Sequence, residues 1–351
     1  MGTTRRLPAL GHGNNFDGLR LIASLMVLVS HQFALLGTTE PTLVPGMTLG
    51  MIAVAMFFVM SGYLVTQSWY QDPHIIRFAM RRFLRIWPGL IVATVVLVIA
   101  SAAITSLPLH DYFGKETRRF ITFNAQLRAV YTLPGVFATT PFNAVRSAVN
   151  GSWWTIPLEA RCYAYLIVLG AMGLRRRLFS VLALILVAFM YARTLPGHAM
   201  DNAFHNLRYF YTAFFLGGVC ARQFADEIQR HYRLMLCVGA GVVIVAGLRS
   251  QVGLAEWIVI GSLTLLVGSR STPGLRSAAR FGDLSYGIYI YAYFVQQWTV
   301  HIWPATSSYP ATLAVACLIT ILLGWCSWHA VEAPALALKK RLRRWFPDAA
   351  A

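Results

Sequence analysis

The chain has 351 residues, of which 57% are hydrophobic and only 12% are charged, and its mean hydropathy is +0.57. Soluble domains carry roughly twice this charged fraction. The composition therefore excludes an ordinary soluble enzyme and indicates a membrane protein. A net charge of +17 also suits a nucleic-acid-binding protein, but polytopic membrane proteins gather basic residues on their cytoplasmic loops, so the placement of these residues decides between the two.

Apolar stretches of roughly 17 to 25 residues are needed to cross about 30 Å of hydrocarbon. About ten such stretches predict an all-α fold, a polytopic transmembrane helical bundle. The predicted spans are residues 18–36, 46–67, 86–106, 155–173, 178–193, 208–223, 234–250, 253–268, 283–303 and 310–330. The fifth and sixth are short, so nine or eleven spans remain alternatives. The first is interpreted as a retained span and not a signal peptide, because it keeps two ionisable residues and has no small-residue cleavage site.

The basic residues predict the orientation of these spans. With the N-terminus inside, the cytoplasmic segments hold 20 of the 30 basic residues. They are Arg5, Arg6, Arg77, Arg81, Arg82, Arg85, Arg175, Arg176, Arg177, Arg222, Arg230, Arg233, Arg270, Arg276, Arg280, Lys339, Lys340, Arg341, Arg343 and Arg344. The short outer loops hold only Arg193, Arg208 and Arg249. Both termini are therefore predicted to be cytoplasmic, and no nucleic acid is needed to explain the charge.

The domain organisation follows from the same pattern: a single transmembrane domain over residues 1–340 and a basic cytoplasmic tail over 341–351. One outer segment, residues 107–152, is far longer than the others. Loops of this length in a compact protein are usually functional lids or binding loops, and a mobile periplasmic loop is the open alternative. The five cysteines stand singly in apolar runs without metal-ligand spacing, so neither a disulfide framework nor a metal site is expected.

Residues 16–33 carry Arg20 and His31 within an apolar run. Eleven residues are almost three helical turns, so both side chains lie on one face, about 16 Å apart along the axis. Ionisable groups cost several kcal/mol in hydrocarbon and usually mark a site or a pathway there. Histidine is the usual general base for activating a hydroxyl, although a lone histidine in a helix is more often a packed, hydrogen-bonded group.

A second candidate is Glu159 in the stretch SWWTIPLEARCY, residues 152–163. Paired tryptophans are typical of a membrane interface, and Pro157 suits the first turn of a helix. The topology places Glu159 and His31 at similar depth near the outer face, where a carboxylate could orient the imidazole. An ion pair of Glu159 with Arg161 or a structural hydrogen bond is the alternative.

A third candidate is the arginine cluster in RFAMRRFLRIWP, residues 77–88. Arg82 and Arg85 are neighbours on one helical face, and Arg77 and Arg81 share another. Guanidinium groups suit phosphate oxygens, but anchoring to anionic lipid explains such a cluster as well. Gly62 and Ser61 in FFVMSGYL could allow close helix packing. His329 and Glu332, one turn apart, predict a helix-end pair.

Six motifs occur in an order that resembles the acyltransferase 3 family of bacterial membrane acyltransferases, over about residues 12 to 340. They are Arg20 and His31 with ten residues between them, FFVMSGYL at 57–64, Arg82 and Arg85 followed by IWP, WTIPLE with Glu159, SYGIYIY at 285–291 and VEAP at 331–334. Each motif is weak alone, whereas six in order are specific.

The resemblance implies an enzyme of the bacterial inner membrane that moves an acyl group, commonly acetyl from acetyl-CoA, to a hydroxyl of a glycan, a lipid-linked saccharide or another envelope molecule. It implies His31 as the catalytic histidine, Glu159 as its acidic partner, and Arg20, Arg82 and Arg85 as residues near the CoA phosphates, with no metal. Direct attack with His31 as base is the hypothesis, and an acyl-enzyme is the alternative. The chain ends shortly after its last span, so without an appended SGNH domain it is expected to transfer the acyl group by itself.

A rival from another class is a proton-coupled transporter or flippase that uses His31 and Glu159 as a proton relay. The absence of an evident internal repeat and the ordered motifs argue against it. The acceptor, the acyl chain length and the oligomeric state stay open at the level of sequence.

Overall fold

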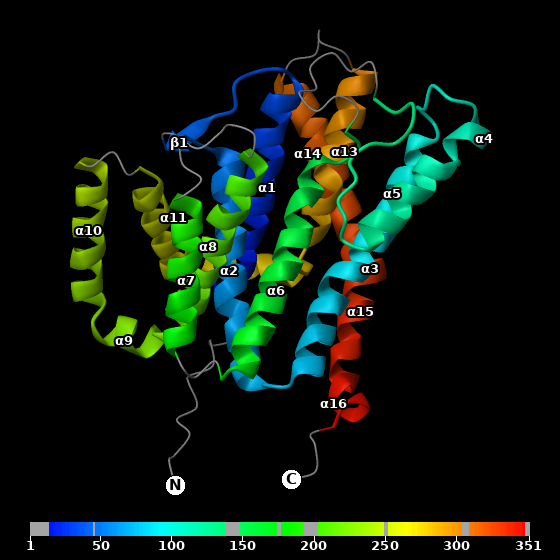
Figure 1. The fold of residues 1–351 in the computed structure, drawn as a ribbon. Helices are drawn as coiled ribbons and strands as arrows, with labels where there is room; N and C mark the ends of the chain where they lie inside the picture. The colour runs from blue at the N-terminus through cyan, green and yellow to red at the C-terminus, as the bar shows by residue number, and fades with distance from the viewer. Residues whose placement is uncertain are drawn as a thin grey trace.

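The structure is a computed structural model and describes residues 14–44, 46–137, 148–173, 177–192, 203–248, 252–303 and 309–347. Within these residues it is a helical bundle (Figure 1). The long helices are α1 (Phe16–Leu35), α2 (Leu49–Gln71), α3 (Ile75–Ser101), α6 (Thr155–Ala171), α7 (Arg177–Ala192), α8 (Ala203–Gln223), α10 (Tyr232–Leu248), α11 (Val252–Gly268), α13 (Ser285–Ile302) and α14 (Tyr309–Ser327).

Short elements connect the long helices. They are the antiparallel strands β1 (Thr42–Val44) and β2 (Met47–Thr48), then α4 (Leu109–Tyr112), α5 (Lys115–Ala125), η1 (Gly151–Trp154), α9 (Ala225–Arg230), α12 (Pro273–Arg276), η3 (Ser277–Phe281), the π-helical turn η4 (Trp328–Glu332), α15 (Ala333–Ala337), η5 (Leu338–Arg341) and α16 (Leu342–Trp345).

The all-α fold predicted from the sequence is confirmed, because each predicted apolar stretch forms a helix in the described residues. Four helices are long and apolar enough to cross a membrane: Phe16–Leu35, Leu49–Gln71, Ile75–Ser101 and the continuous segment Tyr309–Trp345. Arg177–Met190 and Ala255–Gly268 are shorter apolar helices. The number of spans and the side on which each terminus lies stay predictions.

α3 begins well before residue 86, the predicted start of the third span. The helix begins at Ile75, and the His74 ring Nδ1 caps it by accepting the backbone N–H of Arg77. Arg77 and Arg81, which the sequence places on one helical face, meet the same carboxylate: Arg77 donates to Asp72 with Nη2–Oδ1 at 2.6 Å, and Arg81 also donates to Asp72. The basic turns are therefore helical and continuous with the apolar part of α3.

Asp72, at the turn between α2 and α3, supports a pH-dependent prediction. Burial alone would raise the pKa of this carboxyl, but the hydrogen bonds and charges of Arg77 and Arg81 lower it to about 2. Because the folded pKa lies below the unfolded value of about 3.9, the stabilisation is complete above pH of about 4 and is lost as the pH falls towards 2.

We therefore expect Asp72→Asn to lower the unfolding midpoint of the purified protein at pH 7, since hydrogen bonds to charged groups contribute roughly 1.5–3 kcal/mol each. The difference in unfolding midpoint between variant and wild type should narrow below pH of about 4, because Asp72 of the unfolded chain binds a proton there before the folded carboxyl, with its pKa of about 2, does. Thermal unfolding across this pH range measures both effects. Exposed Asp111→Asn is the matched control, and a gap that stays constant with pH would contradict the account.

Glycines bring helices into contact, as the sequence predicts for Gly62. A Cβ atom on Gly62 of α2 would lie 2.0 Å from the Phe215 carbonyl oxygen of α8, and one on Gly218 of α8 would lie 2.2 Å from the Val59 carbonyl oxygen of α2. Gly287 of α13 packs on Gly324 of α14 in the same way. Small residues at such crossings allow the close backbone approach that holds helices together in membranes.

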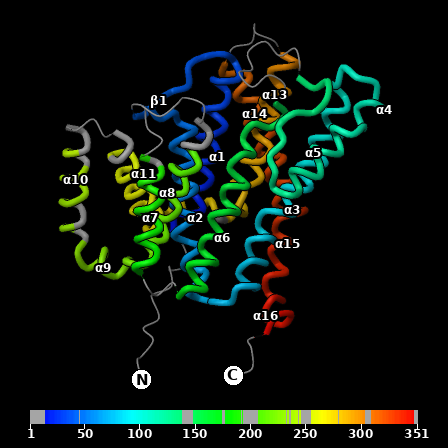
Figure 2. Tube along the Cα trace, in the orientation of Figure 1, coloured from blue at the N-terminus to red at the C-terminus, as the bar shows by residue number. Residues whose placement is uncertain are grey.

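The outer surface of the bundle is apolar, while polar side chains lie inside it. Ile99 of α3, Ile185 of α7 and Leu318 of α14 are more than half exposed, whereas Gln296 and Gln297 of α13 are fully buried. Helices α9 and α10 lie at one edge of the bundle and α4 and α5 at the other (Figure 2). An apolar exterior around a polar interior is the pattern expected for a protein surrounded by lipid.

The predicted long loop 107–152 contains helices α4 and α5, which rest on the end of α3. The Tyr112 hydroxyl donates to the Val98 carbonyl oxygen at 2.7 Å, and the indole N–H of Trp87 donates to the Ala125 carbonyl oxygen at 3.0 Å. The described part of this segment is thus a packed cover on α3. Residues 138–147, on which the choice between lid and mobile loop also depends, lie outside the described residues.

Candidate functional site

A cavity of about 60 Å³, counted as the space open to the centre of a water molecule, lies where α1, α2, α3, α6 and α13 meet. Its polar lining consists of Arg20, Ser61, Arg85, Thr155, Glu159 and Ser285. Its remaining lining consists of Val54, Phe57, Phe58, Ile86, Ile156, Tyr286 and Tyr289. One water needs roughly 10–15 Å³ of such space, so the cavity accepts a few waters or a slender chain and excludes a bulky group.

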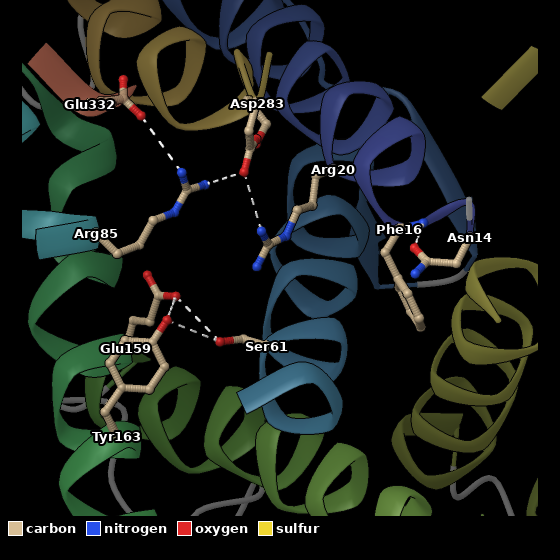
Figure 3. A network of polar contacts seen from close by, with 10 residues as sticks. Asn14, Phe16, Arg20, Ser61, Arg85, Glu159, Tyr163, Asp283 and Glu332 are labelled. Atoms are coloured by element: carbon tan, nitrogen blue, oxygen red, sulfur yellow. Dashed lines mark hydrogen bonds and ion pairs between the residues drawn. The ribbon is translucent and has the colours of Figure 1, made fainter. Parts of the chain in front are cut away.

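Two of the predicted arginines meet at Asp283 (Figure 3). Arg85 Nη2 lies 2.6 Å and Arg20 Nη1 lies 3.3 Å from the same carboxylate oxygen of Asp283. Gly282, with φ of +87°, makes the turn before Asp283, and the Ser285 hydroxyl donates to the other carboxylate oxygen at 2.5 Å. This turn ties the start of α1 to α3 and to the start of α13.

Arg85 also faces Glu332, with 3.7 Å between Nη1 and Oε2. Glu332 is 2% exposed, lies in the π-helical turn η4 and accepts a hydrogen bond from the Ser327 hydroxyl at 2.9 Å. His329 is exposed and its Nδ1 pairs with the Trp325 carbonyl oxygen instead. The predicted His329 and Glu332 pair was therefore wrong, because the wider π turn directs the two side chains to different sides.

Glu159 lies in the cavity near the start of α6, and Pro157 occupies the first turn of that helix as predicted. Its Oε1 accepts hydrogen bonds from the Ser61 hydroxyl of α2, at 3.3 Å, and from the Tyr163 hydroxyl (Figure 3). Both bonds fall on one oxygen, so within the described chain Oε2 has no hydrogen-bond partner. Arg161 is exposed and makes no ion pair with Glu159.

His31 lies outside this cavity. Its ring makes an edge contact with Tyr293 of α13, with 5.2 Å between centroids, and its Nδ1 is buried without a hydrogen-bond partner in the described residues. The expected pairing with Glu159 is not formed, because Glu159 projects into the cavity while His31 is about 16 Å beyond Arg20 along α1. Tyr293 is one helical turn beyond Tyr289, which lines the cavity, so α13 connects the two places.

Arg82 adjoins the cavity from the side of Tyr163. Its guanidinium lies 5.6 Å from the Tyr163 ring centroid and 5.8 Å from that of Phe78, and its Nε is buried without a partner among the described residues. Unlike Arg85, Arg82 makes no ion pair within the described residues. It interacts electrostatically with Arg81 and Arg85, which leaves a local excess of positive charge.

The sequence interpretation missed the residues that hold this site together, above all Asp283 and Tyr163, and it did not give Ser61 or Glu332 a role in the site. Acidic residues number only 13 in the chain, and an acidic residue just before an apolar span is a signal that could have pointed to Asp283. No local signal indicates which arginine each carboxylate meets, since Arg20 and Asp283 are 263 positions apart.

Comparisons with known proteins agree with the motifs. The chain matches the acyltransferase domain family over residues 14–329. It is 29% identical over 332 residues to an O-acetyl transferase of Shigella phage Sf6, covering 91% of this chain and 95% of that protein. It is 28% identical over 369 residues to nodulation protein 10 of Rhizobium leguminosarum bv. viciae, covering 95% of each. No solved structure matches it significantly. The arginines and the glutamate that meet in the cavity lie within the matched residues, and the chain belongs to the acyltransferase 3 family.

Proposed function

We propose that this protein is an O-acyltransferase of the bacterial inner membrane that moves an acetyl group from cytoplasmic acetyl-CoA to a hydroxyl of a cell-envelope glycan or lipid-linked saccharide. The observation that carries the proposal is the cavity itself, in which three motif residues of an acyltransferase family, Arg20, Arg85 and Glu159, line one space among five helices. The apolar helices support a place in the membrane.

The narrow cavity suits the slender pantetheine arm of CoA better than its nucleotide. The nucleotide phosphates would then lie by the arginines at the start of α3, of which Arg82 is the one without a carboxylate partner in the described chain. The arm would run past Glu159 and Tyr289 towards His31. An extended arm of this kind is long enough to cover the roughly 16 Å between the levels of Arg20 and His31.

At the His31 end the acceptor hydroxyl oxygen attacks the thioester carbonyl carbon. His31 takes the hydroxyl proton, the carbon–sulfur bond breaks, and the protonated His31 gives this proton to the sulfur, so that CoA leaves as a thiol. The buried Nδ1 without a partner supports this role, because a general base needs one ring nitrogen that can accept. The products are an acetyl ester and free CoA.

Purified protein in detergent, incubated with radiolabelled acetyl-CoA and a panel of envelope glycans, tests the function. We expect label to appear on a glycan as an ester that hydroxylamine cleaves. A folded protein that neither binds CoA nor moves label would contradict the proposal. Reconstituted vesicles that accumulate a substrate without chemical change would indicate the transporter instead.

Arg82 gives a separate test of the donor site. We expect Arg82→Gln to weaken CoA binding about tenfold or more, since a charge-assisted hydrogen bond contributes roughly 1.5–3 kcal/mol. Titration calorimetry with CoA measures this change. Arg81→Gln is the control, because Arg81 is already held by Asp72 and its loss should change CoA affinity less. Equal CoA affinities for wild type and Arg82→Gln would indicate that Arg82 anchors the protein to lipid and does not bind CoA.

A further inference from the structure

A second hollow lies on the outer surface of the bundle, between α6 and α7, with α8 beneath it. It has a volume of about 570 Å³ and is lined by most of the length of α6, the second part of α7 and the first two thirds of α8. Val168, Leu186 and Met190 supply an apolar wall, and Val168 and Leu186 are more than half exposed. We call this hollow the α6–α7 groove.

Two arginines stand in the α6–α7 groove at matching positions. Arg161 is six residues into α6 and Arg208 is five residues into α8, which places them about 9 Å and 7.5 Å from the starts of their helices. The sequence analysis assigned Arg208 to an outer loop, but α8 begins at Ala203, so the residue is within the helix. Both side chains are exposed, and neither has an ion pair within the described residues.

Arginines within apolar helices are costly in lipid unless an anion or water reaches them. No carboxylate lines the α6–α7 groove, so no anion from the described residues meets the two arginines there. Guanidinium groups on two helices offer paired donors to phosphate oxygens. The hydroxyls of Tyr165 and Tyr209, which also line the groove, are suited to the polar part of the same ligand.

We propose that the α6–α7 groove binds one anionic phospholipid, with its phosphate between Arg161 and Arg208 and an acyl chain along Val168, Leu186 and Met190. The site requires that these helices lie in a membrane and does not depend on the acyl-transfer chemistry. It is separate from the cavity: Glu159 and Arg161 are two residues apart on α6, hence about 200° apart around the helix. The occupant therefore lies across α6 from the reacting groups, which favours a resident lipid over a lipid-linked acceptor.

Native mass spectrometry of protein extracted in mild detergent tests this site. We expect the wild type to retain one phosphatidylglycerol, and added phosphatidylglycerol to raise the unfolding midpoint more than phosphatidylcholine does. Arg161→Gln combined with Arg208→Gln should reduce retention at least tenfold. The corresponding double lysine variant keeps the charge and should retain more lipid than the double glutamine variant.

Arg118→Gln is the matched control, because Arg118 is an exposed arginine of α5 outside the groove, and it should retain lipid like the wild type. Equal retention by the double glutamine variant and the wild type would overturn the proposal. Equal binding of phosphatidylglycerol and phosphatidylcholine would overturn the charge-based recognition. A polyprenyl-linked saccharide retained in place of phospholipid would overturn the choice of occupant.

Discussion

Replacing His31 with alanine is expected to reduce acetyl transfer by roughly 10²- to 10⁴-fold, the range that general acid–base catalysis usually contributes. The imidazole is the only group at that level of α1 for which the structure leaves a buried ring nitrogen unpartnered in the described residues. The small side chain removes the edge contact with Tyr293, so the fold should survive with a modest loss of stability. Turnover at saturating acetyl-CoA, measured with the labelled-glycan assay, gives the effect.

The matched control for His31 is His329→Ala. His329 is exposed in the η4 turn, where its ring bonds to the Trp325 carbonyl oxygen and packs on the Trp325 ring, so its replacement should leave transfer close to that of the wild type. CoA affinity should be unchanged in both variants, because neither histidine lines the cavity that is proposed to hold the arm. Near-normal turnover of folded His31→Ala would show that His31 is not the general base.

The sequence predicted the helices well, because long apolar stretches have few structures open to them in lipid. The predicted boundaries were less accurate where a helix carries charged residues. The third span was predicted to start at residue 86, although Asp72 and the His74 cap help to extend α3 back to Ile75. The continuation of α14 through the π turn to Trp345 was missed for the same reason, since its basic residues resemble a tail.

The candidate site was predicted less completely than the fold. The motif residues were found individually, and Arg20, Arg85 and Glu159 do meet. Their partners could not be predicted, because the pairing of Arg20 with Asp283 depends on how α1 and α13 pack. Depth was not predicted either: α6 begins at Thr155 as expected, yet Glu159 lines the cavity together with Arg20 and not at the level of His31.

The position of Glu159 leads to the second large prediction. Its Oε1 is held by Ser61 and Tyr163, while Oε2 is without a hydrogen-bond partner in the described chain. Glu159→Gln keeps the shape and an acceptor for both hydroxyls but removes the negative charge. If the carboxylate, which the proposed donor arm passes, positions the thioester for attack at His31, the turnover number should fall roughly 10²-fold with little change in the KM for acetyl-CoA.

The split between turnover and KM distinguishes this role from a simpler one. If Glu159 serves only to balance the charge of Arg20 and Arg85 in the cavity, its neutralisation changes donor binding and leaves the turnover number intact. Glu116→Gln, at an exposed residue of α5, controls for loss of a carboxylate elsewhere. Tyr163→Phe should give a smaller decrease in turnover than Glu159→Gln. It removes one of the two hydrogen bonds that orient Oε1 of Glu159, while the carboxylate itself remains in place.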